Sequence, residues 1–339
     1  MAATPSIGSF LWLLIVLFSL LMYIILDGYD LGIGMLLLTE RDDARRKEMM
    51  EIVATAWDGN ESWLILVGVG LFGGFPLAYG ILLPALYVPF ILMLFALMFR
   101  GISIEFQSQS PDYRRDWGLI FAIGSFVAAL CQGVILGSIL TGIPVVHDHF
   151  AGEPFSFLSA FSLLTAVFLI AAYCLNGATW LNDKTDGTLQ TNSQQKGRLL
   201  TLLVGALLIV VLIIALLSSP VIGPIVLSSR LLFLIGVVIL AGVALLVARS
   251  LLKRTNGLLP FLLTVFALAL GILGLLSINY PYMVPPAVTI WQAASTGSSV
   301  SFLLVGVGLC MPVVIAYNAY AYYVFRGKFT LPELRKASS

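Results

Sequence analysis

The chain has 339 residues, of which 60% are apolar and only 10% are charged. A soluble domain carries about 25% charged residues, so most of the surface of this chain must face lipid. Eighteen Lys and Arg residues against seventeen Asp and Glu residues leave a net charge of +1, which offers no electrostatic basis for binding nucleic acid. The apolar content excludes a disordered chain. The three cysteines lie in apolar runs without paired spacing, so neither a disulfide framework nor a zinc site is expected.

Nine stretches of the sequence are long and apolar enough to cross a membrane as helices, which takes about 20 residues for a hydrocarbon core of roughly 30 Å. They lie at about residues 8–38, 50–73, 77–100, 117–142, 157–181, 199–219, 230–249, 258–278 and 299–325. We therefore predict an all-α, polytopic fold in which residues 1–339 form a single integral membrane domain. The first eleven residues contain no Lys or Arg, so we expect the first span to be retained and not cleaved as a signal peptide.

Basic residues fall almost entirely on one side of this arrangement. Seventeen of the eighteen Lys and Arg residues lie in the odd-numbered connections and the carboxyl-terminal tail, and only Arg230 lies on the other side. Because short cytoplasmic loops are enriched in Lys and Arg, we predict an outside amino terminus and a cytoplasmic carboxyl terminus.

Four carboxylic acids lie within the first two predicted spans. Asp27 and Asp30 are three residues apart, as are Asp58 and Glu61, so each pair lies on one face of its helix. Counted from the loop near 39–49, Asp27 and Asp58 both lie roughly 13–17 Å deep at about 1.5 Å per residue. A charged side chain at a helix centre costs about 2.5–3.5 kcal/mol, which argues for a partner group, a water-filled cavity or a proton-carrying task.

The sequence leaves two interpretations of these acids open. Asp27 and Asp30 could hydrogen-bond the free backbone groups of a helix that is broken at the neighbouring glycines, or they could hydrogen-bond a partner subunit. Alternatively, they could carry protons. For Asp58 and Glu61 a functional role is favoured because of their polar and aromatic surroundings. Those surroundings are Trp57, Asn60 and Trp63.

Glu105 follows the third predicted span, five residues after Arg100. There it could collect protons from cytoplasmic water, with the adjacent guanidinium favouring its ionised form, or it could make an ordinary interfacial ion pair. The spacing does not separate these two roles.

The only histidines are His147 and His149, both in the predicted outer loop 143–156. Haems in helical bundles are usually held by intramembrane histidines, so we expect this chain alone to bind no haem and no metal. Near the inner end of the last span, four tyrosines are typical of an interfacial belt: Tyr317, Tyr320, Tyr322 and Tyr323.

Three motifs in the first part of the chain closely resemble subunit II of the cytochrome bd family of quinol oxidases. Residues 27–34 read DGYDLGIG, residues 57–64 read WDGNESWL and residues 99–106 read FRGISIEF. The resemblance is strong over roughly residues 20–140. Afterwards it rests on length, helix count and the WQAAS segment at 291–295. The short chain and the third motif look like the cyanide-insensitive branch of the family.

The resemblance implies a nine-helix subunit built as two four-helix bundles plus one peripheral helix. It implies a homologous partner, subunit I, that carries two haems b and haem d, while subunit II has no redox centre of its own. Such a pair is a terminal quinol oxidase of the bacterial inner membrane, which reduces oxygen to water in aerobic respiration and moves protons by vectorial chemistry.

The resemblance also implies a hydrophilic passage from the cytoplasm toward the oxygen-reducing haem. On this sequence the passage maps to Asp58 and Glu105, with Glu61 as a supporting carboxyl. A lysine that some family members carry is replaced here by Gln107 and Gln109, so the entrance of the passage is left open. The sequence also leaves open which quinone is used, whether a structural quinone or lipid is bound, and whether small single-helix accessory subunits are present.

A secondary transporter is the alternative class, because carboxylates beside glycine-rich helices also occur in ion-coupled carriers. Nine spans do not divide into two equal inverted halves, which disfavours this alternative.

Overall fold

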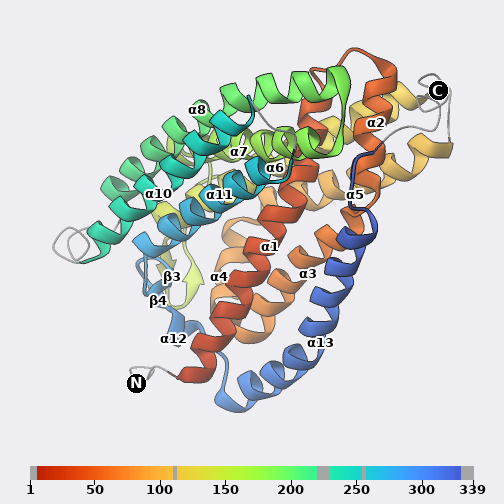
Figure 1. The fold of residues 1–339 in the computed structure, drawn as a ribbon. Helices are drawn as coiled ribbons and strands as arrows, with labels where there is room; N and C mark the ends of the chain where they lie inside the picture. The colour runs from red at the N-terminus through yellow and green to blue at the C-terminus, as the bar shows by residue number, and fades with distance from the viewer. Residues whose placement is uncertain (1–5, 110–112, 220–228, 254–256, 330–339) are drawn as a thin grey trace.

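The computed structural model describes residues 6–109, 113–219, 229–253 and 257–329, and these residues are helical apart from two short hairpins (Figure 1). The helices of the first half are α1 Ile7–Leu37, α2 Asp43–Ala54, α3 Trp57–Gly74, α4 Pro76–Ala85, α5 Tyr87–Gln109 and α6 Arg114–Thr141. Those of the second half are α7 Ala160–Lys184, α8 Gly187–Ser218, α10 Ser229–Leu251, α11 Leu259–Ile278, α12 Ile290–Ala293 and α13 Gly297–Val324. The antiparallel hairpins are β1 Val145–Val146 with β2 His149–Phe150, and β3 Tyr282–Val284 with β4 Val288–Thr289.

Eight helices of the described residues are long and apolar enough to cross a membrane: α1, α5, α6, α7, α8, α10, α11 and α13. The predicted all-helical, multi-pass fold is therefore confirmed. Helix α3 has 18 residues but is not among the eight, and its first turns carry Asp58, Asn60 and Glu61. The ninth span, the two bundles and the orientation of the termini stay predictions.

Two of the predicted spans are interrupted. The span at 50–73 is divided at Thr55 and Ala56, where α2 ends and α3 begins. Half of the twelve residues of α2 are charged, so it forms a separate polar helix before α3. Asp58 lies in the first turn of α3, after this break, so its depth, which was counted along a continuous helix, stays a prediction.

The second interruption divides the predicted span 77–100 at Leu86, between α4 and α5. Pro84 and Pro89 flank this residue, and neither can donate a backbone hydrogen bond. Helix α5 then continues to Gln109, so Arg100 and Glu105 lie on the same helix.

Helix α1 lies at the centre of the molecule and packs against α3, α6 and α7 (Figure 1). It is continuous, so the alternative in which Asp27 and Asp30 satisfy a helix broken at the glycines does not hold. These glycines allow close packing: a Cβ on Gly32 would lie 1.8 Å from the carbonyl oxygen of Tyr173, and a Cβ on Gly177 would lie 2.6 Å from the backbone nitrogen of Ile33. The backbones of α1 and α7 therefore touch where the two helices cross.

Helices α8, α10 and α11 lie on the α7 side of α1, whereas α13 runs along α1 and α3 on the opposite side (Figure 1). Only 6% of the apolar window of α13 is buried within the chain. Almost all of its surface therefore faces lipid or another protein.

Basic connections gather at one end of the molecule. The backbone N–H of Phe329 donates to the carbonyl of Lys184, the last residue of α7, and the Lys196 ammonium of α8 donates to the hydroxyl of Thr39. The chain after α13, the end of α7, the first part of α8 and the loop after α1 therefore meet there. We call this the basic end. At the opposite end, Arg230 donates to the carbonyl of Tyr280 just before β3. Of the basic residues counted in the sequence, Arg254, Arg335 and Lys336 lie outside the described residues.

Candidate functional site: a charged centre between α1, α3 and α5

An ion-pair cluster lies inside the helices that carry the three sequence motifs. Arg100 of α5 and Asp27 of α1 are both fully buried, and Arg100 Nη2 lies 2.6 Å from Asp27 Oδ1. The same nitrogen lies 3.6 Å from Oε2 of Glu61 on α3, whose side chain is 21% exposed. One guanidinium thus joins a sealed carboxylate to a carboxylate that reaches the protein surface.

A second polar cluster lies one helical turn from the first. Asn60 Nδ2 donates to Asp30 Oδ2 at 2.8 Å and to the hydroxyl of Tyr29 at 3.1 Å. The hydroxyls of Tyr29 and Tyr322 are 2.9 Å apart, and Tyr322 donates to Asn60 Oδ1 at 2.9 Å. Asp30 is fully buried, and its Oδ1 has no hydrogen-bond partner among the described residues.

Gln132 of α6 hydrogen-bonds tyrosines of α1 and α7 beside Asp27. Its amide nitrogen donates to the hydroxyl of Tyr23 at 2.7 Å, and the hydroxyl of Tyr173 donates to its amide oxygen at 2.7 Å. Tyr23 lies four residues before Asp27, on the same face of α1. Polar groups of α1, α6 and α7 therefore surround the buried carboxylate.

A groove between α3 and α5 leads to the ion-pair cluster from outside. It has a volume of about 510 Å³ and is lined by Glu61 and Glu105, with Trp57 beside them. Trp57 packs on Gly101, where a Cβ would lie 3.0 Å from the indole ring. A small residue at 101 therefore allows the tryptophan to form one wall of the groove.

Asp58 does not line this groove. Its side chain is exposed and borders a separate cavity of about 80 Å³, which Asn318 and Tyr322 of α13 also line. Trp63 is fully buried and makes an edge-to-face contact with Phe18, with ring centroids 5.7 Å apart. Among the predicted residues, the structure thus brings Asp27, Glu61 and Arg100 into contact and joins Asp30 to Asn60, while Asp58 lies apart.

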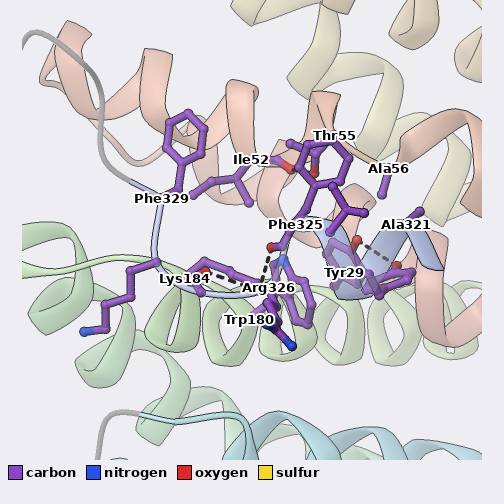
Figure 2. A pocket seen from close by; sticks show the side chains of 14 residues that line it. Tyr29, Ile52, Thr55, Ala56, Trp180, Lys184, Ala321, Phe325, Arg326 and Phe329 are labelled. Atoms are coloured by element: carbon purple, nitrogen blue, oxygen red, sulfur yellow. Dashed lines mark hydrogen bonds between the residues drawn. The ribbon is translucent and has the colours of Figure 1, made fainter. Parts of the chain in front are cut away.

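A pocket of about 260 Å³ opens at the basic end, between α1, α2, α7 and α13 (Figure 2). Its wall includes Tyr29, Trp180 and Phe325, and the ring of Tyr29 stacks on that of Trp180 with centroids 4.5 Å apart. The Lys184 ammonium donates to the carbonyl of Phe325 and lies 4.8 Å from the centre of the Trp180 ring. The pocket therefore joins the basic end to the hydroxyl of Tyr29.

Sequence reasoning missed Tyr29, Gln132 and Tyr322. Tyr322 was assigned to an interfacial belt, but its hydroxyl lies in the cluster with Asn60, so this assignment is wrong for that residue. Tyr29 stands between the two aspartates of the first motif, and Gln132 is an amide within an apolar span. A polar side chain inside an apolar span indicates by itself that this side chain has a buried partner, and this signal could have identified Gln132.

Metal-binding groups are absent from the described residues, in that no cluster of three or more His, Cys, Asp or Glu side chains could hold an ion. His147 lies in the exposed turn between β1 and β2, and His149 is the first residue of β2. The described helices therefore contain no histidine.

The fold and the site define a multi-pass membrane protein with a carboxylate–guanidinium centre inside its helices. The sequence model of the family described as "Cytochrome bd terminal oxidase subunit II" matches residues 9–325. The chain belongs to this family, as its motifs predicted, and it is a multi-pass protein of the bacterial inner membrane.

Two curated relatives and one solved structure resemble the chain. "Cytochrome bd-I ubiquinol oxidase subunit 2" of Escherichia coli (strain K12) is 36% identical over 211 residues, which are 58% of this chain and 55% of that relative. The match therefore spans little more than half of the relative. "Cytochrome bd ubiquinol oxidase subunit 2" of Bacillus subtilis (strain 168) is 24% identical over 95% of this chain and 97% of the relative. A chain of the bd oxidase from Geobacillus thermodenitrificans has the same fold, with a TM-score of 0.78, 16% identity and coverage of 95% of this chain and 99% of that one.

Proposed function

We propose that this chain is subunit II of a terminal quinol oxidase that reduces oxygen to water, and that it supplies the protons for this reaction from the cytoplasm. The observation that carries the proposal is the contact of one buried guanidinium, Arg100, with both Asp27 and Glu61. The relatives named ubiquinol oxidase subunit 2 support the reaction class. Membership of the cyanide-insensitive branch stays a prediction.

The groove between α3 and α5 supports a partner on this face. Glu61 and Glu105 line a groove whose other side chains are apolar, and a carboxylate facing lipid is costly. A second protein that covers this face would seal the groove and turn it into a passage. We assign the face formed by α3, α5 and α13 to the homologous subunit I.

The proposed passage begins at Glu105, near the end of α5, and continues to Glu61. Glu61 shares Arg100 with Asp27, so a proton that neutralises Glu61 changes the charge balance around Asp27. Asp58 lies in the first turn of the same helix as Glu61 and serves as a second relay group toward the partner. The reduction of one O₂ to two molecules of water takes up four protons and four electrons. The electrons come from two quinols, which are oxidised to quinones.

The redox groups of this reaction, two haems b and haem d, belong in our proposal to subunit I. The described helices of this chain contain no histidine, which is the usual haem ligand of helical bundles. Haem supplies electron transfer and oxygen binding, and the residues of this chain hold and move protons. The ninth span, the outside amino terminus and the cytoplasmic basic end are parts of the same proposal. The quinone used, any structural quinone or lipid and any accessory subunit are not assigned.

The experiment compares Glu61→Gln, Asp58→Asn and Glu105→Gln in the purified two-subunit oxidase. Each amide keeps the shape of the carboxyl but cannot exchange a proton, so oxygen uptake per haem with saturating quinol should fall. We expect Glu61→Gln to lose about tenfold or more, since proton transfer by a positioned group contributes about 10²–10⁴-fold. Glu105→Gln should lose less, because water near the membrane surface can replace a group at the mouth.

Glu51→Gln on α2 is the matched control, because it changes a carboxyl that neither lines the groove nor contacts Arg100. Haem content should stay normal in all four variants. Wild-type oxygen uptake in fully assembled Glu61→Gln and Asp58→Asn would show that the protons travel elsewhere. A transporter receives no support from the family match, and substrate binding by the isolated chain would be needed to restore that alternative.

A further inference from the structure

The pocket at the basic end is separate from the groove between α3 and α5. Its lining comes from α1, α2, α7 and α13, and none of Glu61, Glu105 or Asp58 takes part (Figure 2). At about 260 Å³ it can hold several waters, since one water occupies about 30 Å³ of liquid. The charged residues of its lining are Lys184, Arg326 and Lys328, of which Lys184 pairs with Asp183 and Lys328 with Asp186.

Inside the pocket, the hydroxyls of Tyr29 and Tyr322 stand between this volume and the buried carboxyl group of Asp30. Both tyrosines line the pocket, and their hydroxyls are 2.9 Å apart. Asn60 donates to Tyr29 and to Asp30 from the same amide nitrogen, at 3.1 and 2.8 Å. The tyrosine hydroxyl and the carboxylate are therefore close enough for a single water to bridge them.

Asp30 is also close to the ion-pair cluster. It follows Asp27 by three residues on a continuous helix, so the two carboxyl groups share one face of α1. A route through the pocket would therefore reach the cluster of Asp27, Arg100 and Glu61 from its Asp30 end, so that Glu61 serves both routes and Glu105 serves the groove alone.

We propose that this pocket is a second proton entrance, which leads from the basic end through Tyr322 and Tyr29 to Asp30. This inference rests on the proposed function. A hydronium ion in the pocket gives a proton to the Tyr322 hydroxyl, which passes its own proton to Tyr29, and Tyr29 passes its own proton through a bridging water to Asp30. A water molecule is left in the pocket, both hydroxyls end unchanged, and the Asp30 carboxylate gains one proton. Asn60 is a positioning residue, because its amide nitrogen donates hydrogen bonds to both the hydroxyl of Tyr29 and the carboxylate of Asp30.

The test exploits the parallel arrangement of the two entrances. Tyr322→Phe and Tyr29→Phe remove one hydroxyl each and keep the rings, and Glu105→Gln weakens the groove. With two parallel entrances each single variant should lose about twofold or less in oxygen uptake per haem, whereas Tyr322→Phe combined with Glu105→Gln should lose about tenfold, a non-additive result of the kind that double-mutant cycles detect. Proton uptake from the cytoplasmic side of vesicles should fall in parallel.

Tyr323→Phe is the matched control, because Tyr323 is exposed, neighbours Tyr322 and stacks on Arg326 outside the cluster. Combined with Glu105→Gln it should give the Glu105→Gln rate. If the double variant with Tyr322→Phe also gives that rate, the second entrance is overturned while the groove stands. If Glu105→Gln and Glu61→Gln are both normal and Tyr322→Phe alone loses activity, the groove fails and the pocket is the entrance.

A second measurement does not depend on assembly of the tyrosine variants. Thr55 lines the pocket, so Thr55→Cys can be modified with a bulky thiol reagent from the cytoplasmic side, in a chain with Cys310→Ser because Cys310 is exposed. Modification should slow oxygen uptake severalfold in the Glu105→Gln background and have little effect when Glu105 is intact. Complete modification with no loss in the Glu105→Gln background would overturn the second entrance.

Discussion

At the scale of single residues, the site depends on Arg100. It is a fully buried guanidinium whose charge is balanced by Asp27 and Glu61. Removing one partner of a buried ion pair leaves the other charge uncompensated, at a cost of about 3–5 kcal/mol. This one side chain therefore controls both the stability of the core and the charge of the proposed passage.

We expect Arg100→Met to lower the thermal midpoint of the purified complex and its yield, because Asp27 would remain buried without a cation. Asp27→Asn in the same chain should restore part of the loss, since it removes the stranded charge. Arg41→Met, at an exposed loop position, is the control. A midpoint for Arg100→Met equal to that of the control would contradict the importance of the pair.

Glu48 of α2 provides a pH-dependent prediction outside the spans. Burial raises the pKa of Glu48 from 4.5 to about 7, the charge of Asp186 adds to this rise, and Arg45 opposes it. The folded chain therefore holds an extra proton between about pH 4.5 and 7. By linkage, the contribution of this carboxyl to the unfolding free energy falls as pH rises through that window.

Glu48→Gln should accordingly raise the thermal midpoint relative to the wild type at pH 8, and most of this gain should be lost near pH 4.5, where the wild-type carboxyl is protonated in the folded state and half protonated in the unfolded state. Thermal unfolding at both pH values checks this, with Glu51→Gln as the comparison because its side chain is 39% exposed. A gain of the same size at both pH values would assign the effect to packing and not to titration.

At the scale of the elements, the crossing of α1 and α7 places the first motif. Gly32 and Gly177 let the two backbones meet, and the ring of Tyr173 packs over Gly28. This contact sets the rotation of α1, and with it the direction in which Asp27 and Asp30 point.

Gly177→Ala should therefore destabilise the chain, because its Cβ would lie 2.6 Å from the backbone nitrogen of Ile33 and would push the helices apart. Gly236→Ala on α10 is the control, since no atom lies within 4 Å of its Cβ position. The control should be neutral or stabilising by up to about 1 kcal/mol, from the higher helix propensity of alanine. The thermal midpoint should fall below that of the wild type for Gly177→Ala and should stay equal or rise for Gly236→Ala. Equal midpoints for the two variants would show that α1 and α7 can separate without cost.

At the scale of the whole molecule, one face of the chain is not covered by the chain's own helices. Helices α3 and α13 lie on the side away from α8, α10 and α11 (Figure 1). The acidic groove is formed by α3 and α5, and only 6% of the apolar window of α13 is buried. A carboxylate-lined groove in an apolar surface requires a cover, so we expect the isolated chain to be less stable than the complex.

We predict that the chain expressed alone binds no haem and that coexpression with its partner gives a haem-bearing complex. The two histidines lie on an exposed hairpin, and intramembrane histidines are the usual haem ligands of helical bundles. Visible absorption spectra of the tagged chain, purified with and without the partner, measure this. Stoichiometric haem in the folded, isolated chain would contradict the assignment.

The sequence by itself determined the membrane class, the approximate spans, the one-sided basic connections and the family. These properties are local, because the apolar run of about 20 residues that a span requires and the three motifs can each be read from neighbouring residues. The presence of a charged centre was also predictable, because a carboxyl group within a span is costly and therefore calls for a partner group.

Only the tertiary structure decided which of these groups meet. Arg100 was expected beside Glu105, five residues away, but it contacts Asp27 and Glu61. Asp58 was expected to share one face of its helix with Glu61, but its side chain is exposed and borders a separate cavity. Such contacts depend on how each helix is rotated and where two helices cross, and glycines distant in sequence set this by allowing backbones to touch. Spacing along one helix determines which residues share a face, but it does not determine which neighbouring helix that face meets.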